Sequence, residues 1–180
     1  MSIYYTGNGD KGGTSVIKGK KLQKSSPLIE ALGDVDELSS SIGVALFYVR
    51  DEALRGELRS IQNDLFSIGA ILASADGENT TKAEINAAKI EKLEKSIDAM
   101  DKKMPQLTKF VLPGGSEESS HLHLARSIAR RAERKIVSAS EKHRIDPNLL
   151  AYMNRLSSFL FTAALYVNHL NGVEESNPIY

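Results

Sequence analysis

The sequence contains no cysteine, and this absence excludes disulfide bonds, a thiol nucleophile and zinc held by thiolates. It also fits a reducing compartment. The N-terminus lacks the apolar stretch of a secretory signal, and no apolar run approaches the ~18 residues of a membrane-spanning helix. We therefore expect a cytoplasmic protein without a membrane partner.

Net charge is lacking as well, because Lys+Arg and Asp+Glu each number 23. The global basic excess of a nucleic-acid binder is missing, so we expect no nucleic-acid partner and look for anion binding in local clusters. Histidines number only four, and His121 and His123 would face different sides of a helix. We therefore predict no protein-ligated metal site. The remaining composition, 41% hydrophobic and 26% charged, is typical of one globular domain.

Hydrophobic residues recur at intervals of three and four, which predicts an all-α, five-helix bundle. We expect the first helix to begin at Asp34, where Glu37 would complete a capping box, and to reach Val49. The other four are expected from Leu54 to Leu72, from Ile90 to Met100, from near Ser116, and from Pro147 to about Asn171, where Gly172 ends the last.

The expected domain organisation is a single unit, residues 1–180, with a loop-rich N-terminal arm at 1–26 and the bundle at 34–172. The fifth helix is apolar nearly all round, which is typical of a central helix. It also contains Asn154 and Arg155. A charge in such a helix requires a partner, a ligand or a subunit boundary.

An arginine cluster marks the fourth helix. At ~100° per residue, Arg126, Arg130, Glu133 and Arg134 share one face and Arg131 lies at its margin. The planar fork of arginine suits bidentate binding of phosphate or carboxylate, which favours a polyanionic ligand. An ordinary solvated face with charge pairs along the helix is the alternative.

A glycine-rich segment lies in the arm. Gly7, Gly9 and Gly12 match G-x-G-x-x-G, but neither the strand and helix of a dinucleotide-binding unit nor the lysine of a Walker A loop follows. Glycines still allow close approach of backbone N–H groups to an anion, and Lys11, Lys18 and Lys24 add charge. A flexible arm is the alternative. Together with the arginine helix, the segment suggests a gripped triphosphate.

Several motifs resemble, in order and spacing, the PduO-type ATP:cob(I)alamin adenosyltransferases. They are Thr6 to Thr14 (TGNGDKGGT), Lys24, Val35-Asp36-Glu37-Leu38, Phe110 to Gly115 (FVLPGG), Arg126 to Arg134, and Asn154-Arg155-Leu156-Ser157. The resemblance covers essentially the whole chain. It implies a homotrimer with active sites between subunits, and transfer of the adenosyl group of ATP, bound with Mg²⁺, to reduced cobalamin with release of triphosphate.

The resemblance also implies roles for individual residues. The expected nucleotide-binding set is Thr6, Gly7, Gly9, Asp10, Gly12, Gly13, Thr14, Lys24, Arg130, Arg131, Glu133, Arg134 and Asn154. The expected catalytic set is Lys24, Phe110, Arg130, Arg134 and Asn154, where Phe110 would occupy the lower face of the corrin and exclude the axial ligand. Asp36 and Arg126 would form an intersubunit salt bridge.

Two positions depart from the pattern of the family. Gly7 stands where a basic residue is usual, and Ser158 stands where some members carry Asp, so a phosphate contact and a polar contact to corrin or ribose are in question.

Three functional hypotheses remain distinguishable. The first is the adenosyltransferase, with a reductase or an adenosylcobalamin-dependent enzyme as a further partner. The second is a bundle that binds ATP or a corrinoid as a sensor or carrier without turnover. The third is a helical interaction module whose arginines contact an acidic protein, which predicts no stabilisation by ATP.

Overall fold

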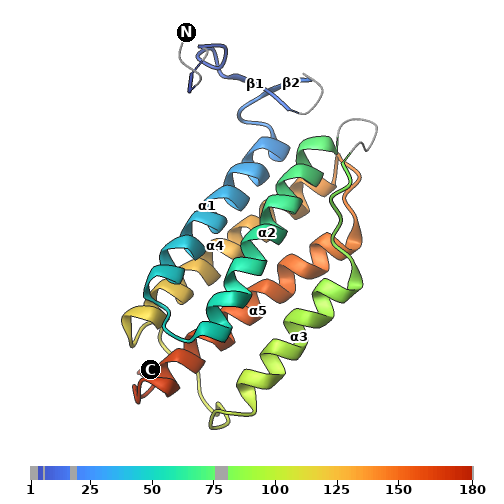
Figure 1. The fold of residues 1–180 in the computed structure, drawn as a ribbon. Helices are drawn as coiled ribbons and strands as arrows, with labels where there is room; N and C mark the ends of the chain where they lie inside the picture. Colours follow the sequence, from blue (N-terminus) through green and yellow to red (C-terminus); the bar gives the residue numbers. More distant parts are fainter. Residues whose placement is uncertain (1–3, 6, 17–19, 76–80, 180) are drawn as a thin grey trace.

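The computed structural model describes residues 4–5, 7–16, 20–75 and 81–179, which form five helices and one two-stranded sheet (Figure 1). The elements are β1 (Gly13–Ser15), β2 (Lys21–Gln23), α1 (Pro27–Tyr48), α2 (Glu52–Ser74), α3 (Ala87–Asp101), α4 (Glu117–Ser140) and α5 (Pro147–Leu170). The predicted five-helix bundle is confirmed. None of the described helices is both long and apolar enough to cross a bilayer.

The first helix begins at Pro27 instead of Asp34, so the predicted capping box is wrong. Proline suits a first helical turn, because its φ is already helical and its missing N–H has no partner to lose there. Leu28 is fully buried and extends the apolar stripe of the helix toward its N-terminus. Asp34 and Glu37 lie within the helix and bond to Arg131 of α4.

The other four helices match the predicted segments. The runs from Leu54 to Leu72 and from Ile90 to Met100 lie within α2 and α3. Ser116 caps α4 by accepting a hydrogen bond from the N–H of Ser119 at 3.2 Å. Pro147 starts α5, and Gly172 follows its end with φ of 65°.

The arm carries a small antiparallel hairpin that the sequence analysis did not predict. Thr14 of β1 lies opposite Leu22 of β2. The strands are only three residues long, too short for the alternation of polar and apolar residues to be recognisable. Leu22 packs against the hydrophobic core and so ties the hairpin to the bundle.

The helices pack in a chain of neighbours: α2 against α1, α1 against α4, α4 against α5, and α5 against α3. Buried side chains line most of α5, including Leu149, Phe159 and Leu160. However, Asn154 and Ser158 are exposed, so the burial expected of a central helix does not extend to these two positions of α5. Arg155 has the partner that its position requires, because its Nε donates to Glu94 Oε1 of α3 at 2.9 Å.

A partly buried polar cluster joins three helices. The hydroxyl of Tyr152, a fully buried residue of α5, donates to Asp64 Oδ2 of α2 at 2.9 Å. Lys89 of α3 pairs with the other carboxylate oxygen. Burial, and then the charge of Asp64, raises the pKa of Tyr152, so the phenol stays protonated and donates at all physiological pH values.

We expect Tyr152→Phe to lower the free energy of unfolding by about 1.5 to 3 kcal/mol, because it removes a hydrogen bond to a charged acceptor. Urea unfolding followed by circular dichroism measures the loss. Tyr166→Phe is the matched control, since the Tyr166 hydroxyl accepts one weak contact, from Lys103 Nζ at 3.4 Å, among the described residues. Equal losses in the two variants would contradict a special role for the Asp64 cluster.

Candidate active site

The α4 helix separates apolar and charged side chains as predicted. Its buried positions include Ile128, Ala129, Ala132 and Ile136. Arg130 and Arg134 are exposed, and Glu133 is half-buried. The charged face is therefore available to a ligand, and replacing an arginine there does not disturb the core.

One cavity of about 350 Å³, which we call the polar cavity, is lined by Arg130, Glu133, Arg134, Val137 and Asn154. Asn154 Nδ2 of α5 donates to Glu133 Oε1 of α4 at 2.9 Å, and Arg134 Nη1 donates to the carbonyl of Arg130 at 3.1 Å. Four side chains that the resemblance assigns to nucleotide binding thus come together from two helices. Two guanidinium groups beside one carboxylate leave a net positive site suited to phosphates.

A second cavity of about 410 Å³, the aromatic cavity, lies beside the first. It is lined by Leu107, Phe110, Val111, Arg126, Arg130, Ser157, Ser158, Phe161 and Thr162. Phe110 is 80% exposed at its edge. Arg130 lines both cavities, so a cationic site and a site with two aromatic side chains are neighbours.

Arg126 lies in the wall of the aromatic cavity, and no described carboxylate forms an ion pair with it. Its guanidinium lies 5.7 Å from the centre of the Phe161 ring, and its Nε is buried without a hydrogen-bond partner among the described residues. Burial, and then the charge of Arg130, lowers the pKa of Arg126. Burial, and then the charge of Arg126, lowers the pKa of His123 to about 4, so this imidazole is neutral near pH 7. No ion pair joins Arg126 to Asp36 within the described part of the chain.

Arg131 has a different environment from its neighbours. Its Nε donates to Asp34 Oδ1 of α1 at 3.2 Å, and its Nη2 pairs with Glu37 of α1. Lys135, one turn later, pairs with Glu30. These contacts form a row of ion pairs between α1 and α4, so Arg131 joins two helices and does not line either cavity described above.

The glycine segment of the arm folds into tight turns. The N–H of Asp10 donates to Gly7 O at 3.3 Å, and the N–H of Gly12 donates to Gly9 O at 3.2 Å, so these two amides are occupied within the loop. Gly7 and Gly12 have φ of 70° and 80°, which favours glycine at both. Lys24 Nζ lies 3.2 Å from the position that a Cβ on Gly9 would take, which places this cation beside the loop. Thr6 and Lys18 lie outside the described residues.

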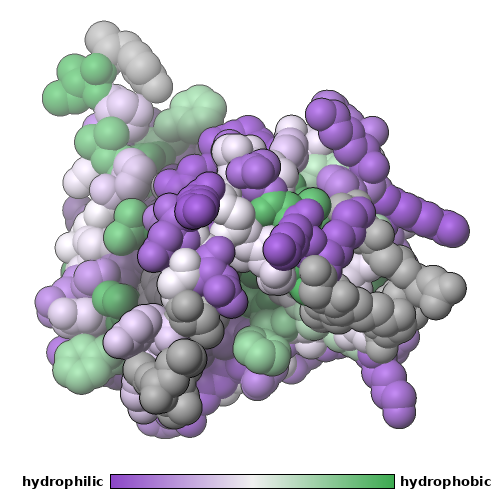
Figure 2. Space-filling model, turned by 90° about the horizontal axis from the view of Figure 1, so that it is seen from above, coloured by the Kyte–Doolittle hydropathy of each residue, from purple (hydrophilic) through white to green (hydrophobic). Residues whose placement is uncertain are grey.

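The arm projects beyond the end of the bundle at which α1 begins (Figure 1). Hydrophilic side chains gather over much of this end of the molecule, with residues of intermediate hydropathy and separate hydrophobic ones between them (Figure 2). Gly13 and Thr14 belong to β1 in the arm, whereas Arg130 and Asn154 belong to the bundle. The bundle residues of the predicted site therefore meet in the polar cavity, and those of the arm meet at the glycine loop. In the described part of one chain, the arm does not cover the polar cavity.

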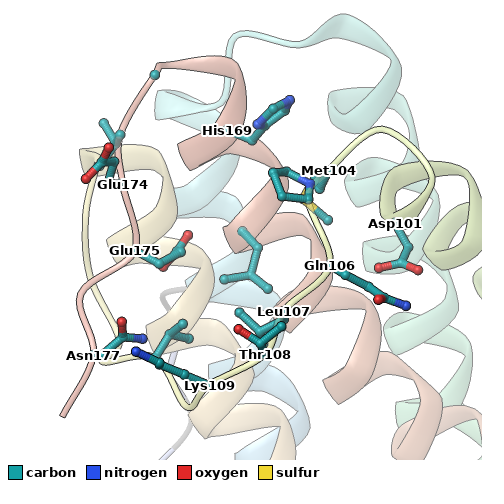
Figure 3. Close-up of a pocket in the computed structure, with 15 residues that line it drawn as sticks. Asp101, Met104, Gln106, Leu107, Thr108, Lys109, His169, Glu174, Glu175 and Asn177 are labelled. Atoms are coloured by element: carbon teal, nitrogen blue, oxygen red, sulfur yellow. The ribbon is translucent and has the colours of Figure 1, made fainter.

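A third cavity of about 540 Å³ lies between residues 101–111, the end of α5 and the C-terminal tail (Figure 3). Leu107 and Val111 line both this cavity and the aromatic cavity. The segment that carries Phe110 thus separates the two. Sequence reasoning did not identify this cavity. The C-terminal tail that lines it has no helical periodicity, so the sequence gives no sign that the tail packs beside α5.

Sequence reasoning also missed Phe161 and Asn168. Phe161 resembles any other apolar residue of α5, and no local signal distinguishes a cavity wall from the core. Asn168 did carry a signal, because an amide in an apolar helix requires partners. It is fully buried, and two of its partners, Gly114 and Ser116, lie far away in the sequence.

Among the described residues, no group of three or more potential metal ligands occurs. Mg²⁺ commonly uses phosphate oxygens, water and one or two carboxylates, so a nucleotide-bound ion does not require such a group. Glu133 supplies a carboxylate in the polar cavity and Asp10 supplies one in the arm, which is compatible with Mg²⁺ arriving with ATP.

Comparisons with known proteins identify the family of the chain. The family model for cobalamin adenosyltransferases matches residues 4–167. The chain is 41% identical over 173 residues to the corrinoid adenosyltransferase of Bacillus subtilis, covering 94% of this chain and 88% of that protein. It is 39% identical over 177 residues to human corrinoid adenosyltransferase MMAB, covering 95% and 71%.

Among solved structures, the chain superposes on a variant PduO-type ATP:corrinoid adenosyltransferase from Lactobacillus reuteri, complexed with cobalamin and ATP, with a TM-score of 0.92. The identity is 36%, and the match covers 97% of this chain and 96% of that one. The chain belongs to the cobalamin adenosyltransferase family and is of the PduO type.

Proposed function

We propose that this protein transfers the 5′-deoxyadenosyl group of ATP to the cobalt of reduced cobalamin, giving adenosylcobalamin and triphosphate. The observation that carries the proposal is the position of Arg130, which lines both the polar and the aromatic cavity. A nucleotide in one cavity and a corrin beside the other would meet at this residue. The Lactobacillus reuteri relative, complexed with both cobalamin and ATP, supports the pairing.

The reaction makes few chemical demands on the protein. The cobalt(I) of the substrate is the nucleophile and attacks the ribose C5′, so that a cobalt–carbon bond forms while the C5′–oxygen bond breaks. The electron pair of the broken bond leaves with triphosphate. No catalytic serine, cysteine or base is needed, and the protein contributes by orienting the ribose and stabilising the leaving group.

The polar cavity is suited to both tasks. Arg130 and Arg134 provide guanidinium groups for the phosphates, and Mg²⁺ bound with ATP would neutralise further charge on the leaving group. Asn154, which is held by Glu133, offers an amide for the nucleoside. We propose that Lys24 contributes from the arm, with the glycine loop covering the phosphates. Arg131, engaged with α1, supports the helix and does not contact ATP in this proposal.

Phe110 is proposed to act on the corrin. Its ring is exposed beside the aromatic cavity, where it would occupy the lower face of the corrin and exclude the axial ligand. Four-coordinate cobalt(II) has no axial electron donor, and its reduction to cobalt(I) is therefore easier.

A homotrimer would complete the site. The arm of one chain projects beyond its own bundle, so the polar cavity of a neighbouring chain is a suitable place for it. Among the described residues of its own chain, no carboxylate pairs with Arg126, and Asp36 is exposed on α1. We propose that these two residues meet across the boundary.

The whole chain, residues 1–180, then acts as one unit. We place it in the cytoplasm, with a reductase as the supplier of electrons.

Anaerobic incubation of the protein with ATP and reduced cobalamin tests the function. The expected result is the absorbance change of cobalt–carbon bond formation, with triphosphate as the second product. A carrier or sensor would bind without this change, and an acidic-partner module would show no rise of the melting temperature with ATP. Release of ADP, or of pyrophosphate with AMP, would contradict the proposed reaction.

Asp36→Ala and Arg126→Ala should each dissociate the trimer or impair turnover. A desolvated pair costs about 3 to 5 kcal/mol to break from one side, whereas an exposed pair is worth about 0 to 1 kcal/mol. Sedimentation velocity and turnover measure the two effects. Asp98→Ala, which removes an exposed acid of α3, is the control and should change neither.

The charge swap Asp36→Arg with Arg126→Asp separates pairing from loss of either residue alone. If the residues meet, the double variant recovers part of the loss through coupling between the sites. Strictly additive losses, or a fully active monomer, would overturn the interfacial pair.

A further inference from the structure

Asn168 lies fully buried near the end of α5 and uses its whole amide. Its Oδ1 accepts from the N–H of Ser116 at 2.8 Å and from the Ser116 hydroxyl at 2.9 Å. Its Nδ2 donates to Gly114 O at 3.0 Å and to Glu175 Oε1 at 3.0 Å. One side chain thus connects the start of α4, the segment that follows Phe110, and the C-terminal tail.

The chain passes Asn168 too closely for any side chain at Gly115. A Cβ built at this position would overlap the Asn168 amide, and the backbone there has φ of 105°. Glycine is therefore required at this position for two reasons: a Cβ would clash with Asn168, and residues with a side chain rarely adopt this positive φ. Such close contact fixes the backbone on the C-terminal side of Phe110.

The tail holds the same segment from the other side. The N–H of Leu112 donates to Ser176 O at 2.7 Å, and Asn177 Nδ2 donates to Phe110 O at 2.8 Å. The tail itself is tied back to α5, because the N–H of Val173 donates to Asn168 O at 2.9 Å. Figure 3 shows Glu175 pointing from the tail toward α5, while Glu174 lies on the other side of the tail.

These contacts matter because the ring of Phe110 is 80% exposed. Few contacts of the ring itself hold it, so its place at the aromatic cavity depends on the backbone of residues 110–115. Hydrogen bonds to Phe110 O and the Leu112 N–H, and the contacts of Asn168 with Gly114 and Ser116, restrain that backbone.

We propose that Asn168 and Glu175 are positioning residues, which hold the Phe110 segment against the C-terminal tail so that the aromatic ring is presented to the corrin. The inference rests on the proposed function in one respect only, the role of Phe110. The latch itself, by which we mean Asn168, Glu175 and their bonds to residues 110–116, is a property of the free protein and is measurable without substrate.

Hydrogen exchange in the ligand-free protein tests the latch. Glu175→Ala should raise the exchange rate of the Leu112 amide about tenfold, because the loss of a hydrogen bond to a charged acceptor frees the tail. Glu175→Gln keeps the accepting Oε1 and should restore most of the protection. Glu174→Ala is the matched control, one residue away, and should leave the rate unchanged. These tail variants avoid the unfolding that Asn168→Ala, in the core, risks.

Turnover then tests the positioning role. With cobalt(II)alamin, a reductant and ATP, Glu175→Ala should lower kcat about tenfold while the KM for ATP stays within about twofold of wild type. The spectrum of enzyme-bound cobalt(II) should show less of the four-coordinate form. Glu175→Gln should restore both kcat and the four-coordinate form of cobalt(II). A merely structural loss would lower activity without this change in the cobalt(II) spectrum.

The outcomes separate the two proposals. Unchanged exchange at Leu112 in Glu175→Ala would overturn the latch. Faster exchange with unchanged kcat and an unchanged cobalt(II) spectrum would overturn the positioning role. A wild-type chain whose Leu112 amide is protected, but which transfers no adenosyl group, would overturn the proposed function and, with it, the catalytic meaning of the latch.

Discussion

Arg130→Ala and Arg134→Ala should each lower kcat/KM for ATP about ten- to a hundredfold, because loss of one charge-assisted phosphate contact costs roughly 1.5 to 3 kcal/mol. Both side chains are exposed on the face of α4 opposite its buried stripe. The melting temperature of the ligand-free variants should therefore stay near that of wild type, while the increase produced by ATP shrinks.

Arg59→Ala provides the matched control. It removes an exposed arginine from the middle turns of α2, and Arg59 lines neither the polar nor the aromatic cavity. Arg130→Lys and Arg134→Lys test the geometry of the contact. Lysine keeps the charge but not the bidentate fork, so the activity should be intermediate. Wild-type kcat/KM in both alanine variants would remove the arginines from the nucleotide site.

The periodic helices could be predicted from local sequence, but the start of the first could not. Pro27 and the pair Asp34 and Glu37 are both valid helix-start signals. The choice between them depends on Leu28, whose burial against the other helices stabilises the earlier start. Local patterns contain no information about that tertiary contact.

The same limit separates the arginines of the candidate site. Helical periodicity alone places Arg130 and Arg134 on one face, and the structure has both in the polar cavity. Arg131 differs because Asp34 and Glu37 of α1 lie opposite it. Its role follows from the pairing of α1 with α4, which is not visible in the spacing of the arginines themselves.

The buried amide of Asn168 shows how much a local signal can reveal. A polar side chain in an apolar stretch indicates that partners exist, because burying it without hydrogen bonds is costly. Which partners it has depends on the course of the loop and the tail, and neither segment has a regular pattern. The sequence therefore identifies such a residue as unusual without giving its role.

Phe110→Ala should sharply lower turnover when the enzyme must work from cobalt(II)alamin, and should leave the KM for ATP nearly unchanged. The physical reason is the position of the ring, which is exposed beside the aromatic cavity and away from the side chains of Glu133, Arg134 and Asn154 that line the polar one. Without the ring, the axial ligand can return to the cobalt, and reduction becomes harder. The expected loss is on the order of a hundredfold or more, comparable to removal of a transition-state interaction of about 3 kcal/mol.

The substrate supplies the control for this variant. Cobalamin that has been fully reduced to cobalt(I) before mixing needs no help from Phe110 to lose its axial ligand, so the variant should be impaired much less with it. Phe110→Tyr retains an aromatic ring and should keep most of the activity from cobalt(II). The spectrum of bound cobalt(II) gives the direct observation, because the four-coordinate form should decrease in Phe110→Ala. If that form persists in full, the ring does not exclude the axial ligand, and the latch that holds its backbone has no role in the reduction step.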